Sequence, residues 1–491
     1  MPKEETLGIT IKKHEDFSEW YNEVVIKSEL AEHSVIKGFM VIRPRGYAIW
    51  EKIQEFFDKN IKKRIGVKNA YFPLLIPDYF FKKEAEHAKG FAPELAWVSE
   101  KEEGVKYAIR PTSETIMYDS YSRWIRSWRD LPLRLNQWGN VLRWEVKQTK
   151  LFLRTREFLW QEGHCAYATS EECNKETLVI LDEYKKVCED LLAIPVLEGK
   201  KTEKERFAGA KTTYTIEALM PDGKALQMGT SHNLGQNFAK AFDIKFIGKD
   251  EKKYLPWQNS WGISTRLIGA LVMAHSDDKG LVLPPKVAPT HLVIVPIYNN
   301  ENKEKVLKKA NELKNMLENQ RFSAPTPLDL KNYEIILDDR DEYKPGWKYN
   351  EWELKGIPLR IEIGPKDIAK NQVVLVRRDN NNKEFIKIAQ LDKKIKDTLE
   401  DMQNALFNKA KKFLDSNISE ATGWNEFVKQ IKSKKLVRAF FCGNGKCEDN
   451  IKEKTDGVTS RLIPFEQPKN MGKCVKCGSG GKFLVIFGKA Y

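Results

Sequence analysis

The feature that most constrains this chain is an alternation of charged and aromatic residues that runs up to His164. In an extended strand, side chains two residues apart lie on the same face of the sheet. Phe158, Trp160, Glu162 and His164 are therefore predicted to share a face. Buried charges need partners, so a face of this composition is a poor core surface and a good ligand-binding surface.

The same kind of pattern begins upstream, before a polar and basic loop. Residues 142–145 read Leu-Arg-Trp-Glu, which predicts a strand with Arg143 and Glu145 on one face. A loop over residues 146–155 would join the two strands as a hairpin. A solvent-exposed amphipathic hairpin is the alternative, but two aromatic side chains on a charged face are unusual for a surface in contact with water.

Length and periodicity divide the chain into several domains. At 491 residues it is too long for a single core, which predicts roughly two to four domains. Strand and helix signals mix up to about residue 285, where a proline-rich linker at residues 283–289 ends the first part. Beyond it, alternating strands and helices predict a compact α/β domain. From residue 391, a charged helical stretch leads to a smaller terminal module.

Hydrophobic periodicity predicts the main elements of the first part. Helices are expected over residues 39–61, 113–129 and 170–192, and strands over residues 70–77 and 133–167. Ser113 is the expected N-cap of the second helix. Gly229, within a predicted strand at residues 227–232, permits a kink or bulge.

The charge balance and the cysteines narrow the class of protein. A formal net charge of +14 favours a polyanionic partner, because clustered cations displace counterions from phosphates. The N-terminal residues carry charges and no apolar core, so no secretory signal is expected, and no apolar run reaches the length of a membrane span. Seven unevenly placed cysteines fit a reducing cytoplasm better than a disulfide scaffold.

Four of the cysteines form two pairs near the end of the chain, Cys442 with Cys447 and Cys474 with Cys477. Neighbouring glycines allow tight turns around a metal, and four thiolates suit a tetrahedral Zn²⁺ with no open position. The spacing therefore predicts a structural zinc ion. Free thiols or two disulfides are the alternatives.

The alternating segment has the pattern Arg-x-Glu, a loop, and then Arg-x-Phe-x-Trp-x-Glu-Gly-His. It resembles motif 2 of the class II aminoacyl-tRNA synthetases in its prolyl form. The resemblance implies that Arg143 binds the α-phosphate of ATP and the substrate carboxylate, while Glu145 accepts from the adenine amino group. It also implies that Phe158 stacks on the adenine and that the loop residue Arg154 reaches the outer phosphates. Fixed cations suit a reaction that brings negative groups together.

The other two motifs of that class have counterparts here. The segment at about residues 38–77 resembles motif 1, a helix and strand at a dimer interface, and residues 261–275 resemble motif 3. Arg266 begins the predicted helix of motif 3, where the helix dipole favours anions, and the family implies contact with the γ-phosphate. Arg143 and Arg266 are the implied catalytic residues. The implied ATP-binding residues are Arg143, Glu145, Arg154, Thr155, Phe158, Gln227, Thr230, Ser264 and Arg266.

Further segments bear on the amino acid. Residues 110–115 resemble the family's T-x-E loop, in which Thr112 and Glu114 contact the amino nitrogen; a capped helix start is the alternative for this pair alone. The resemblance also places Gln227 near a Mg²⁺ ion. Proline brings a cationic secondary amine and a flat apolar ring, which a carboxylate, a hydroxyl and aromatic walls suit. The implied proline-binding residues are Thr112, Glu114, Arg143, Trp160, Glu162 and His232.

The spacing between the motifs distinguishes forms of the family. Only residues 163–260 separate motif 2 from motif 3, too few for the large editing insertion of some bacterial members. The chain therefore resembles the shorter archaeal and eukaryotic form, and no editing of alanine in cis is expected. That form also carries a C-terminal zinc module and a terminal tyrosine near the active site, here Tyr491.

Residues 338–367 resemble the anticodon-binding domain shared by several class II enzymes. Single-stranded bases are read by side chains at sheet edges and helix ends, and Arg340, Glu353 and Lys366 are the candidates. Residues 322–333 look like a surface insertion relative to the family.

These resemblances imply the whole architecture and activity. An α+β catalytic domain with an antiparallel sheet is expected at residues 1–285, an α/β anticodon-binding domain at 286–390, and a small zinc-binding α+β domain at 391–491. The implied activity is that of a prolyl-tRNA synthetase, a cytoplasmic homodimer that activates L-proline with ATP and Mg²⁺ and transfers it to tRNA(Pro).

Two alternatives remain at this point. One is a non-catalytic, synthetase-like tRNA-binding regulator, against which the presence of Arg143, Glu145 and Arg266 argues. The other is a sister enzyme for threonine, histidine or glycine, against which Trp160, Glu162 and His232 argue. His164 shares the strand face, and only a supporting role is expected for it.

Overall fold

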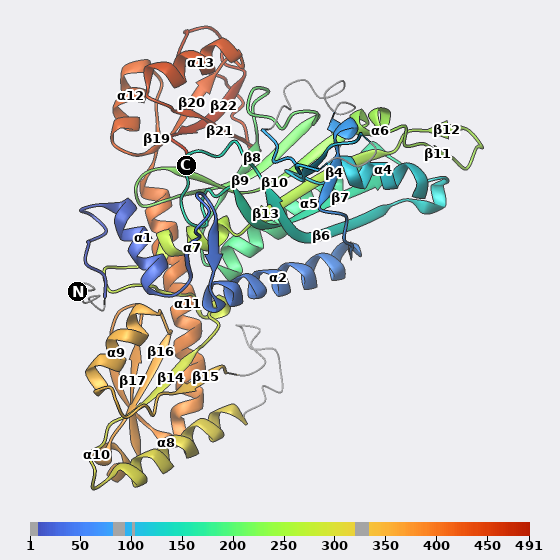
Figure 1. Cartoon of the computed structure of the whole chain (residues 1–491). Coiled ribbons are helices and arrows are strands. Elements are labelled where there is room, and N and C mark those ends of the chain that lie inside the picture. The colour runs from blue at the N-terminus through green and yellow to red at the C-terminus, as the bar shows by residue number, and fades with distance from the viewer. Residues whose placement is uncertain (1–7, 82–93, 101–103, 320–332) are drawn as a thin grey trace.

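A computed structural model describes residues 8–81, 94–100, 104–319 and 333–491. The chain forms three modules, and in Figure 1 the C-terminal module lies above the first module while the middle module lies below it. The predicted succession of an antiparallel α+β domain, an α/β domain and a small α+β domain is confirmed.

An eleven-stranded sheet joins the first and the C-terminal modules. Its neighbours pair antiparallel except for β3 with β6 and β19 with β20. In spatial order the strands are β19 (Ile418–Glu420), β20 (Leu436–Phe441), β22 (Phe483–Gly488), β21 (Thr459–Pro464), β8 (Leu197–Lys200), β9 (Thr212–Leu219), β10 (Ala225–Gly235), β13 (Trp257–Ser264), β7 (Glu157–Tyr167), β6 (Leu133–Leu142) and β3 (Lys68–Asn69).

Helices bury the apolar side of this sheet in the first module. They enclose a large core that includes Trp20, Trp50, Phe57 and Trp261. The helices are α1 (Phe17–Lys27), α2 (Pro44–Ile65), α5 (Ser170–Lys186) with a π-helical turn at Val187–Leu191, and α7 (Arg266–His275).

A second core lies around α4 (Glu114–Trp124) and α6 (Asn237–Ala241). Three short antiparallel pairs complete the module: β1 (Ala31–His33) with β2 (Met40–Ile42), β4 (Leu75–Pro77) with β5 (Tyr107–Ile109), and β11 (Phe246–Ile247) with β12 (Lys253–Tyr254). Short 3₁₀ turns lie at Trp128–Asp130, Pro285–Val287 and Ile388–Gln390.

Several predicted boundaries need correction. The helix expected to reach residue 129 ends at Trp124, because Ile125 is extended and the chain then forms a separate 3₁₀ turn capped by Ser127. The strand expected to run through residue 145 ends at Leu142, and the loop of the hairpin covers residues 143–156. The helix expected from Ser170 is confirmed, with a capping box formed by Thr169 and Glu172.

Two glycines allow the central strands to pack closely. Gly163 pairs with Trp261, and a Cβ at this position would lie 2.1 Å from the indole ring. Gly229 lies at an irregularity in the pairing of β9 with β10, which confirms the bulge expected there.

The middle module is built on a five-stranded mixed sheet, as the alternation of strands and helices predicted. Its strands, in spatial order, are β15 (Ile335–Leu337), β14 (Leu292–Pro296), β16 (Leu359–Ile363), β17 (Gln372–Arg377) and β18 (Lys383–Lys387). Its helices are α8 (Lys303–Glu318), α9 (Pro345–Leu354) and α10 (Pro365–Ala369). The insertion expected at residues 322–333 falls almost wholly outside the described residues.

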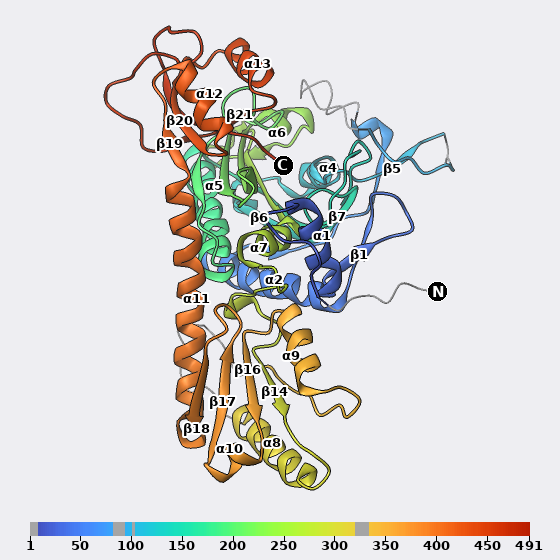
Figure 2. The ribbon, with the colours of Figure 1, turned by 90° about the vertical axis from the view of Figure 1, so that its left-hand side faces the viewer.

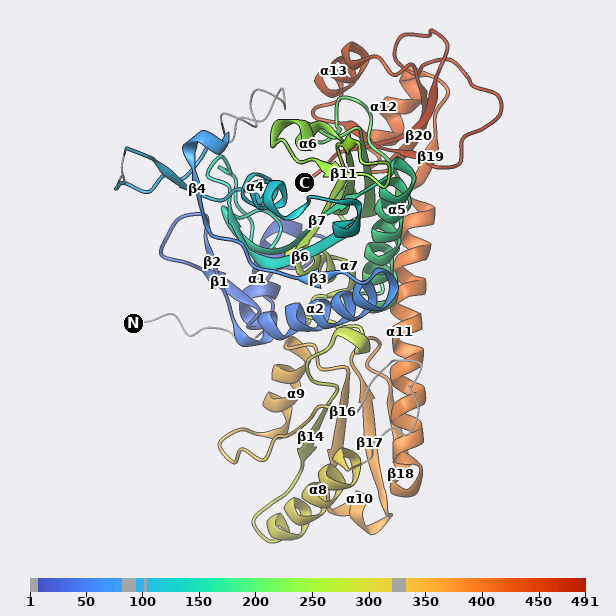
Figure 3. The same cartoon turned by 90° about the vertical axis from the view of Figure 1, so that its right-hand side faces the viewer.

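One long helix, α11 (Leu391–Ser416), runs alongside all three modules (Figures 2 and 3). Ile395 and Leu399 pack in the core of the middle module, Met402 contacts residues of the first module, and Leu414 packs beside strands of the C-terminal module. The predicted boundary at residue 391 therefore coincides with the start of a helix whose two ends serve different modules.

The C-terminal module adds α12 (Trp424–Lys432) and α13 (Gly445–Lys454) to its strands. None of the helices in the described ranges combines the length and apolar composition of a membrane span.

Candidate active site

A cavity of about 390 Å³ opens over β7, β10 and β13. All but two of the cavity residues expected from the motif resemblance line it, the exceptions being Arg154 and Thr155. Expected residues that line the cavity are Thr112, Glu114, Arg143, Glu145, Phe158, Trp160, Glu162, Gln227, Thr230, His232, Ser264 and Arg266.

One face of β7 forms much of the wall. Phe158, Trp160, Glu162 and His164 all line the cavity, which confirms the face predicted from their alternation. Arg143 lies beyond the end of β6 and still reaches this face, with its guanidinium carbon 5.3 Å from the Phe158 ring centroid and 5.6 Å from that of Trp160. The aromatic rings therefore hold the arginine by cation–π contact.

Arg266 is the second cation of the cavity. It begins α7, and its Nε donates to the carbonyl of Leu153 at 3.2 Å while Nη1 lies 3.4 Å from the carbonyl of Gln227. Burial, followed by the nearby charge of Arg143, lowers the pKa of Arg266 to about 10, so it stays charged at neutral pH. Within the described ranges, no carboxylate lies within 4.0 Å of either arginine. Their charges are therefore available to an anionic ligand.

The two carboxylates of the cavity differ in their partners. Glu162 accepts from the Ser113 hydroxyl at 2.5 Å and from its backbone N–H at 3.1 Å, and also from Gln137 and His164 at 3.1 Å each. Glu114 accepts from the Thr112 hydroxyl. The Glu162 carboxylate is thus held by the protein on several sides.

His164 contacts both Tyr118 and Glu162. Its Nδ1 lies 3.1 Å from the Tyr118 hydroxyl and its Nε2 faces Glu162. Burial disfavours the imidazolium, but Glu162 and Glu114 outweigh burial and raise the pKa of His164. In turn, although burial opposes ionisation of Glu162, His164 and Ser113 lower the pKa of that carboxyl.

His232 is different, because burial and the charge of His164 lower its pKa to about 3. It is therefore a neutral imidazole, with Nδ1 2.9 Å from the Thr213 hydroxyl. Its ring lies 4.7 Å from that of Phe207, a further lining residue for which the motifs offered no signal.

Ser113 and Thr155 use their hydroxyls within the protein. Ser113 is the N-cap of α4 as expected, but its hydroxyl serves Glu162 and makes no capping hydrogen bond. The Thr155 hydroxyl donates to the carbonyl of Glu157 at 2.6 Å. Arg154 is exposed on the loop between β6 and β7. Neither Arg154 nor Thr155 is brought into the cavity wall.

A buried ion cluster beside the cavity joins two modules, and the sequence motifs gave no indication of it. Glu217 on β9 accepts from Lys201 at 2.6 Å and from Arg461 on β21 at 2.8 Å. Lys201 also lines the cavity. Burial favours the neutral carboxyl, but Lys201 and Arg461 outweigh it and lower the pKa of Glu217.

The C-terminal Tyr491 docks beside this region. Its backbone N–H donates to the carbonyl of Ala225 at 3.3 Å, at the start of the strand that carries Gln227. The Lys224 ammonium lies 4.9 Å from the tyrosine ring centroid. Tyr491 does not itself line the cavity.

In the middle module, the nucleic-acid candidates have different surroundings. Arg340 is held by Asp338 at 2.8 Å and Glu351 at 2.5 Å. Glu353 lies 3.4 Å from Arg360. Lys366 is exposed at the start of α10.

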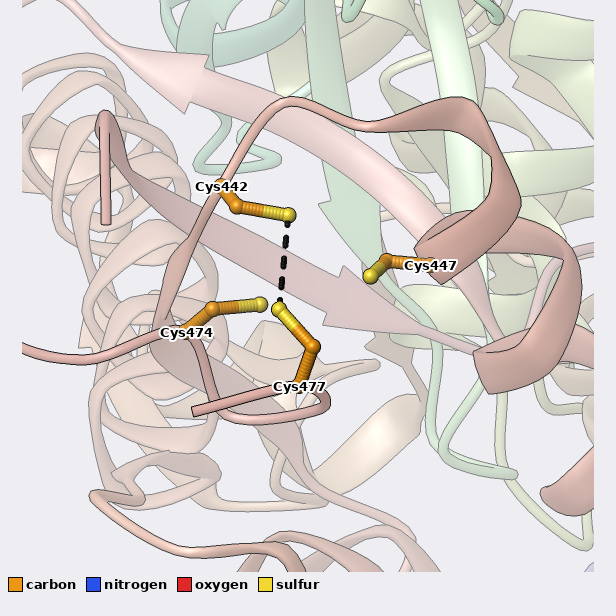
Figure 4. A group of neighbouring side chains, drawn as sticks. All are labelled: Cys442, Cys447, Cys474 and Cys477. Carbon is orange, nitrogen blue, oxygen red and sulfur yellow. Dashed lines mark hydrogen bonds between the residues drawn. The ribbon is translucent and has the colours of Figure 1, made fainter. Parts of the chain in front are cut away.

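The four terminal cysteines converge in the C-terminal module, and Figure 4 shows their side chains pointing toward a common centre. All four sulfurs lie within 4.8 Å of one another, and all four residues are free thiols. The alternative of two disulfides is therefore wrong for this structure. The donor set and its spread fit a tetrahedral metal ion bound by thiolates.

Three family models match the chain. The model for the class II tRNA synthetase core domain (G, H, P, S and T) matches residues 97–275, and an anticodon-binding domain matches residues 291–398. A model for the C-terminal part of prolyl-tRNA synthetase matches residues 424–491.

Similar proteins match over nearly the full length. A proline–tRNA ligase of Natranaerobius thermophilus is 50% identical over 483 residues, covering 97% of each chain. The proline–tRNA ligase 2 of Bacillus thuringiensis subsp. konkukian is 50% identical over 495 residues, covering 100% of both. A proline–tRNA ligase of Alkaliphilus oremlandii is 50% identical over 481 residues, covering 97% of this chain and 96% of its own.

The ion cluster makes a prediction about stability. Replacing Arg461 by Met is expected to lower the free energy of unfolding by about 3 kcal/mol, because it leaves the buried Glu217 charge with one cation fewer. Chemical denaturation measures the change. The folded-state pKa of Glu217 is lowered, so the loss of stability should be full above the ordinary carboxyl pKa and should shrink as the pH falls from that value through the lowered folded-state pKa.

The control is Arg438→Met, which removes an arginine of the same module that forms no ion pair with a described residue. Adding Glu217→Gln to Arg461→Met should restore part of the lost stability, since the two side chains act as a pair. If Arg461→Met lowers the free energy of unfolding no more than Arg438→Met does, the assignment of the ion cluster is contradicted.

Proposed function

The chain belongs to the proline–tRNA ligase family of class II aminoacyl-tRNA synthetases, and we propose that the cavity over β7, β10 and β13 carries out both steps of its ligase reaction. In the first step, the carboxylate of L-proline attacks the α-phosphate of ATP, a carboxyl-to-phosphate bond forms, and pyrophosphate leaves. In the second, a ribose hydroxyl at the 3′ end of tRNA(Pro) attacks the prolyl carbonyl, and AMP leaves. Neither step needs a side-chain nucleophile.

The observation that carries this proposal is the charge arrangement of the cavity. Arg143 and Arg266 have no carboxylate partner within the described part of the chain. Glu114 and Glu162 line the same cavity, where Glu114 accepts from the Thr112 hydroxyl and Glu162 contacts the His164 imidazole. Such a cavity supplies cations for the phosphates of ATP and a carboxylate for the amine of proline.

At the ATP end, Arg143 would bridge the α-phosphate and the proline carboxylate, and Arg266 would hold the γ-phosphate. Phe158 would stack on the adenine while Glu145 accepts from its amino group. The dipole of α7 adds to the charge of Arg266 at the outer phosphates, because that residue is the first of the helix. Both arginines position the reacting groups and stabilise the charge that builds up during phosphoryl transfer.

Other residues of the same end have smaller parts. Gln227 and Thr230 line the cavity from β10, and Ser264 accepts from the backbone N–H of Arg266 at 3.3 Å. The Gln227 side chain offers a carbonyl oxygen to Mg²⁺, which would neutralise phosphate charge when bound. Arg154 stands on the exposed loop, from which it would reach the outer phosphates, while Thr155 supports the base of that loop through its bond to Glu157.

At the proline end, the two carboxylates divide the work. Glu114, whose contact in the described structure is the Thr112 hydroxyl, would accept from the secondary ammonium group. Glu162 would instead hold Ser113 and His164 in place at the cavity wall and add its charge at longer range. Trp160 and the neutral His232 would form the walls against the apolar ring.

The two alternative functions are less well supported. Both motif arginines lie in the cavity, which disfavours a non-catalytic regulator. Full-length similarity at 50% identity to proline–tRNA ligases favours proline over threonine, histidine or glycine. Residues 163–260 form elements of the catalytic module, so this segment contains no separate editing domain. The enzyme is expected to act in the cytoplasm.

In the C-terminal module, Cys442, Cys447, Cys474 and Cys477 would bind one structural Zn²⁺. The ion would hold the segment before α13 against the turn at residues 474–477. No step of the reaction needs it, because four thiolates leave no open position.

A homodimer is favoured by exposed apolar residues in motif 1. Val41, Tyr47, Tyr71 and Leu75 are 46%, 42%, 71% and 40% exposed. The four side chains belong to the motif 1 segment, and a second subunit in contact with that segment would cover them. For Arg340, Glu353 and Lys366, contact with the anticodon remains a proposal that rests on the family resemblance, and Lys366 is the most accessible of the three.

The assignment predicts exchange of labelled pyrophosphate into ATP that depends on proline. In the Glu114→Gln variant, kcat/KM for proline should fall roughly tenfold to hundredfold, because a charge-assisted bond to the ammonium group is lost. Glu198→Gln is the control, since that carboxylate pairs with Lys185 at 3.2 Å and does not line the cavity. Exchange that depends on threonine or glycine, or an unaffected Glu114→Gln variant, would refute the assignment.

Metal analysis of purified protein should find about one zinc ion per chain. Cys474→Ser should lose the metal and lower the melting temperature, because a ligand from the buried side of the cluster is removed. Cys188→Ser, which alters a cysteine outside the cluster, should retain the metal. Protein without zinc and with all four thiols titratable would show that the cluster is not a metal site.

Light scattering should give the mass of two chains for the wild type. The Tyr47→Glu variant should shift the equilibrium toward the monomer, since it places a charge on the exposed apolar surface of motif 1. A wild-type monomer at working concentrations would contradict the dimer.

A further inference from the structure

A second cavity, of about 790 Å³, lies between the first and C-terminal modules. Its walls come from the start of α1, the loop at residues 143–156, the turn before β10, and α12 and α13 with the segments that follow them. In Figure 1 the C-terminus lies between α1 and the C-terminal module, and Lys489, close to that end of the chain, lines the cavity. Seven lysines line it: Lys150, Lys224, Lys432, Lys434, Lys435, Lys454 and Lys489.

Acidic residues balance only part of this charge. Among the lining lysines, Lys224 pairs with Asp222 at 3.2 Å and Lys489 with Asp456 at 2.9 Å. The other acidic lining residues serve the backbone, since Asp16 caps α1 and Glu15 accepts from the N–H of Lys12.

Five lysines therefore remain without a carboxylate within 4.0 Å among the described residues: Lys150, Lys432, Lys434, Lys435 and Lys454. They come from three separate segments that only the tertiary structure brings together. Like charges repel, and the seven lining lysines outnumber the four acidic lining residues, so the cavity favours a further anion.

The basic cavity adjoins the active-site cavity along two segments. The loop at residues 143–156 places Arg143 in the active-site wall and Lys150 in the basic wall. At the start of β10, Lys224 lines the basic cavity and Gln227 the active-site cavity, a separation of three residues or about 10 Å along a strand. A polymer whose end enters the active site would pass beside these lysines.

We propose that the basic cavity holds backbone phosphates of the tRNA acceptor arm next to the 3′ end, with Lys432, Lys434 and Lys435 of the C-terminal module as principal contacts. The inference rests on the proposed function, which brings the 3′ end of a tRNA into the active site. Lysine ammonium groups act as point charges that bind phosphate without reading bases. The cavity would therefore position the RNA strand, and the base sequence of the tRNA would be read elsewhere.

The test is a variant carrying Lys432→Gln, Lys434→Gln and Lys435→Gln. These residues lie at the end of α12 and in the turn before β20, and none lines the active-site cavity. Proline-dependent pyrophosphate exchange, which needs no tRNA, should stay at the wild-type rate. Aminoacylation at limiting tRNA should fall roughly tenfold or more at moderate salt, and the slope of log kcat/KM against log salt should become shallower by about two to three.

The matched control replaces Lys446, Lys452 and Lys469 by Gln. These are exposed lysines of the same module that line neither cavity, so the change in net charge is the same. The control should retain both the aminoacylation rate and the salt slope. A loss equal to that of the first variant would reduce the effect to overall charge and overturn the proposal.

Binding of a fluorescent acceptor-arm minihelix tests whether the lysines contact this part of the tRNA. The wild type and the control should bind it, and the first variant should bind it at least roughly tenfold more weakly. If all three proteins bind equally, the cavity does not hold the acceptor arm. If inorganic tripolyphosphate binds only to the wild type and the control while all three proteins charge tRNA alike, the cavity serves a small free anion and the proposal is wrong.

The two hypotheses fail separately. Absence of proline-dependent exchange in the wild type would defeat the proposed function and with it the tRNA assignment. Normal exchange, with aminoacylation of the first variant unchanged, would defeat the basic-cavity proposal alone.

Discussion

The arrangement of this protein depends on one buried carboxylate, that of Glu217, at the joint between two modules. Its partners are Lys201, which lines the active-site cavity, and Arg461, which belongs to the C-terminal module. The same joint carries backbone pairing between β8 and β21, so a single sheet passes from one module into the other. An ion cluster buried at such a place costs desolvation, and removing one member leaves an unpaired charge. The C-terminal module is therefore part of the support of the active site, although it supplies none of the residues of the three motifs.

Within the cavity, the hydrogen-bond and ion-pair partners of each charged group determine how much of its charge is available to a ligand. Arg143 and Arg266, at the proposed ATP end, are held by carbonyl oxygens and aromatic rings, which orient them and leave their charge uncompensated. At the proposed proline end, Glu162 already accepts from His164 and from Ser113, whereas Glu114 accepts from the Thr112 hydroxyl and would be available to a substrate amine. Fixed charges of this kind need little reorganisation during the reaction, which is the main way in which an enzyme stabilises a transition state without a side-chain nucleophile.

The long helix α11 gives the modules their order in space. Because its apolar residues pack in turn against the middle, first and C-terminal modules, the nucleic-acid candidates of the middle module stand at the far end from the basic cavity (Figure 2). A tRNA also carries its anticodon and its 3′ end far apart. Lys366 and the lysines of the basic cavity lie toward opposite ends of the molecule, which suits a ligand of that shape.

By itself, the sequence determined which strand face would carry the chemistry and where the main elements begin. The alternation from Phe158 to His164, the bulge at Gly229 and the helix that starts at Arg266 are local patterns, and a period of two or of 3.6 residues is enough to predict them. The end of β6 at Leu142 was missed because the loop continues the alternating pattern for a few residues. Only the tertiary structure decided which carboxylate is free, how the basic cavity forms, and that Arg461 supports the active site. Ser113 is 49 positions from Glu162 and Arg461 is 244 from Glu217, and no local periodicity encodes a partner at such a distance. Those pairings follow from how strands and modules pack, which is a property of the whole chain.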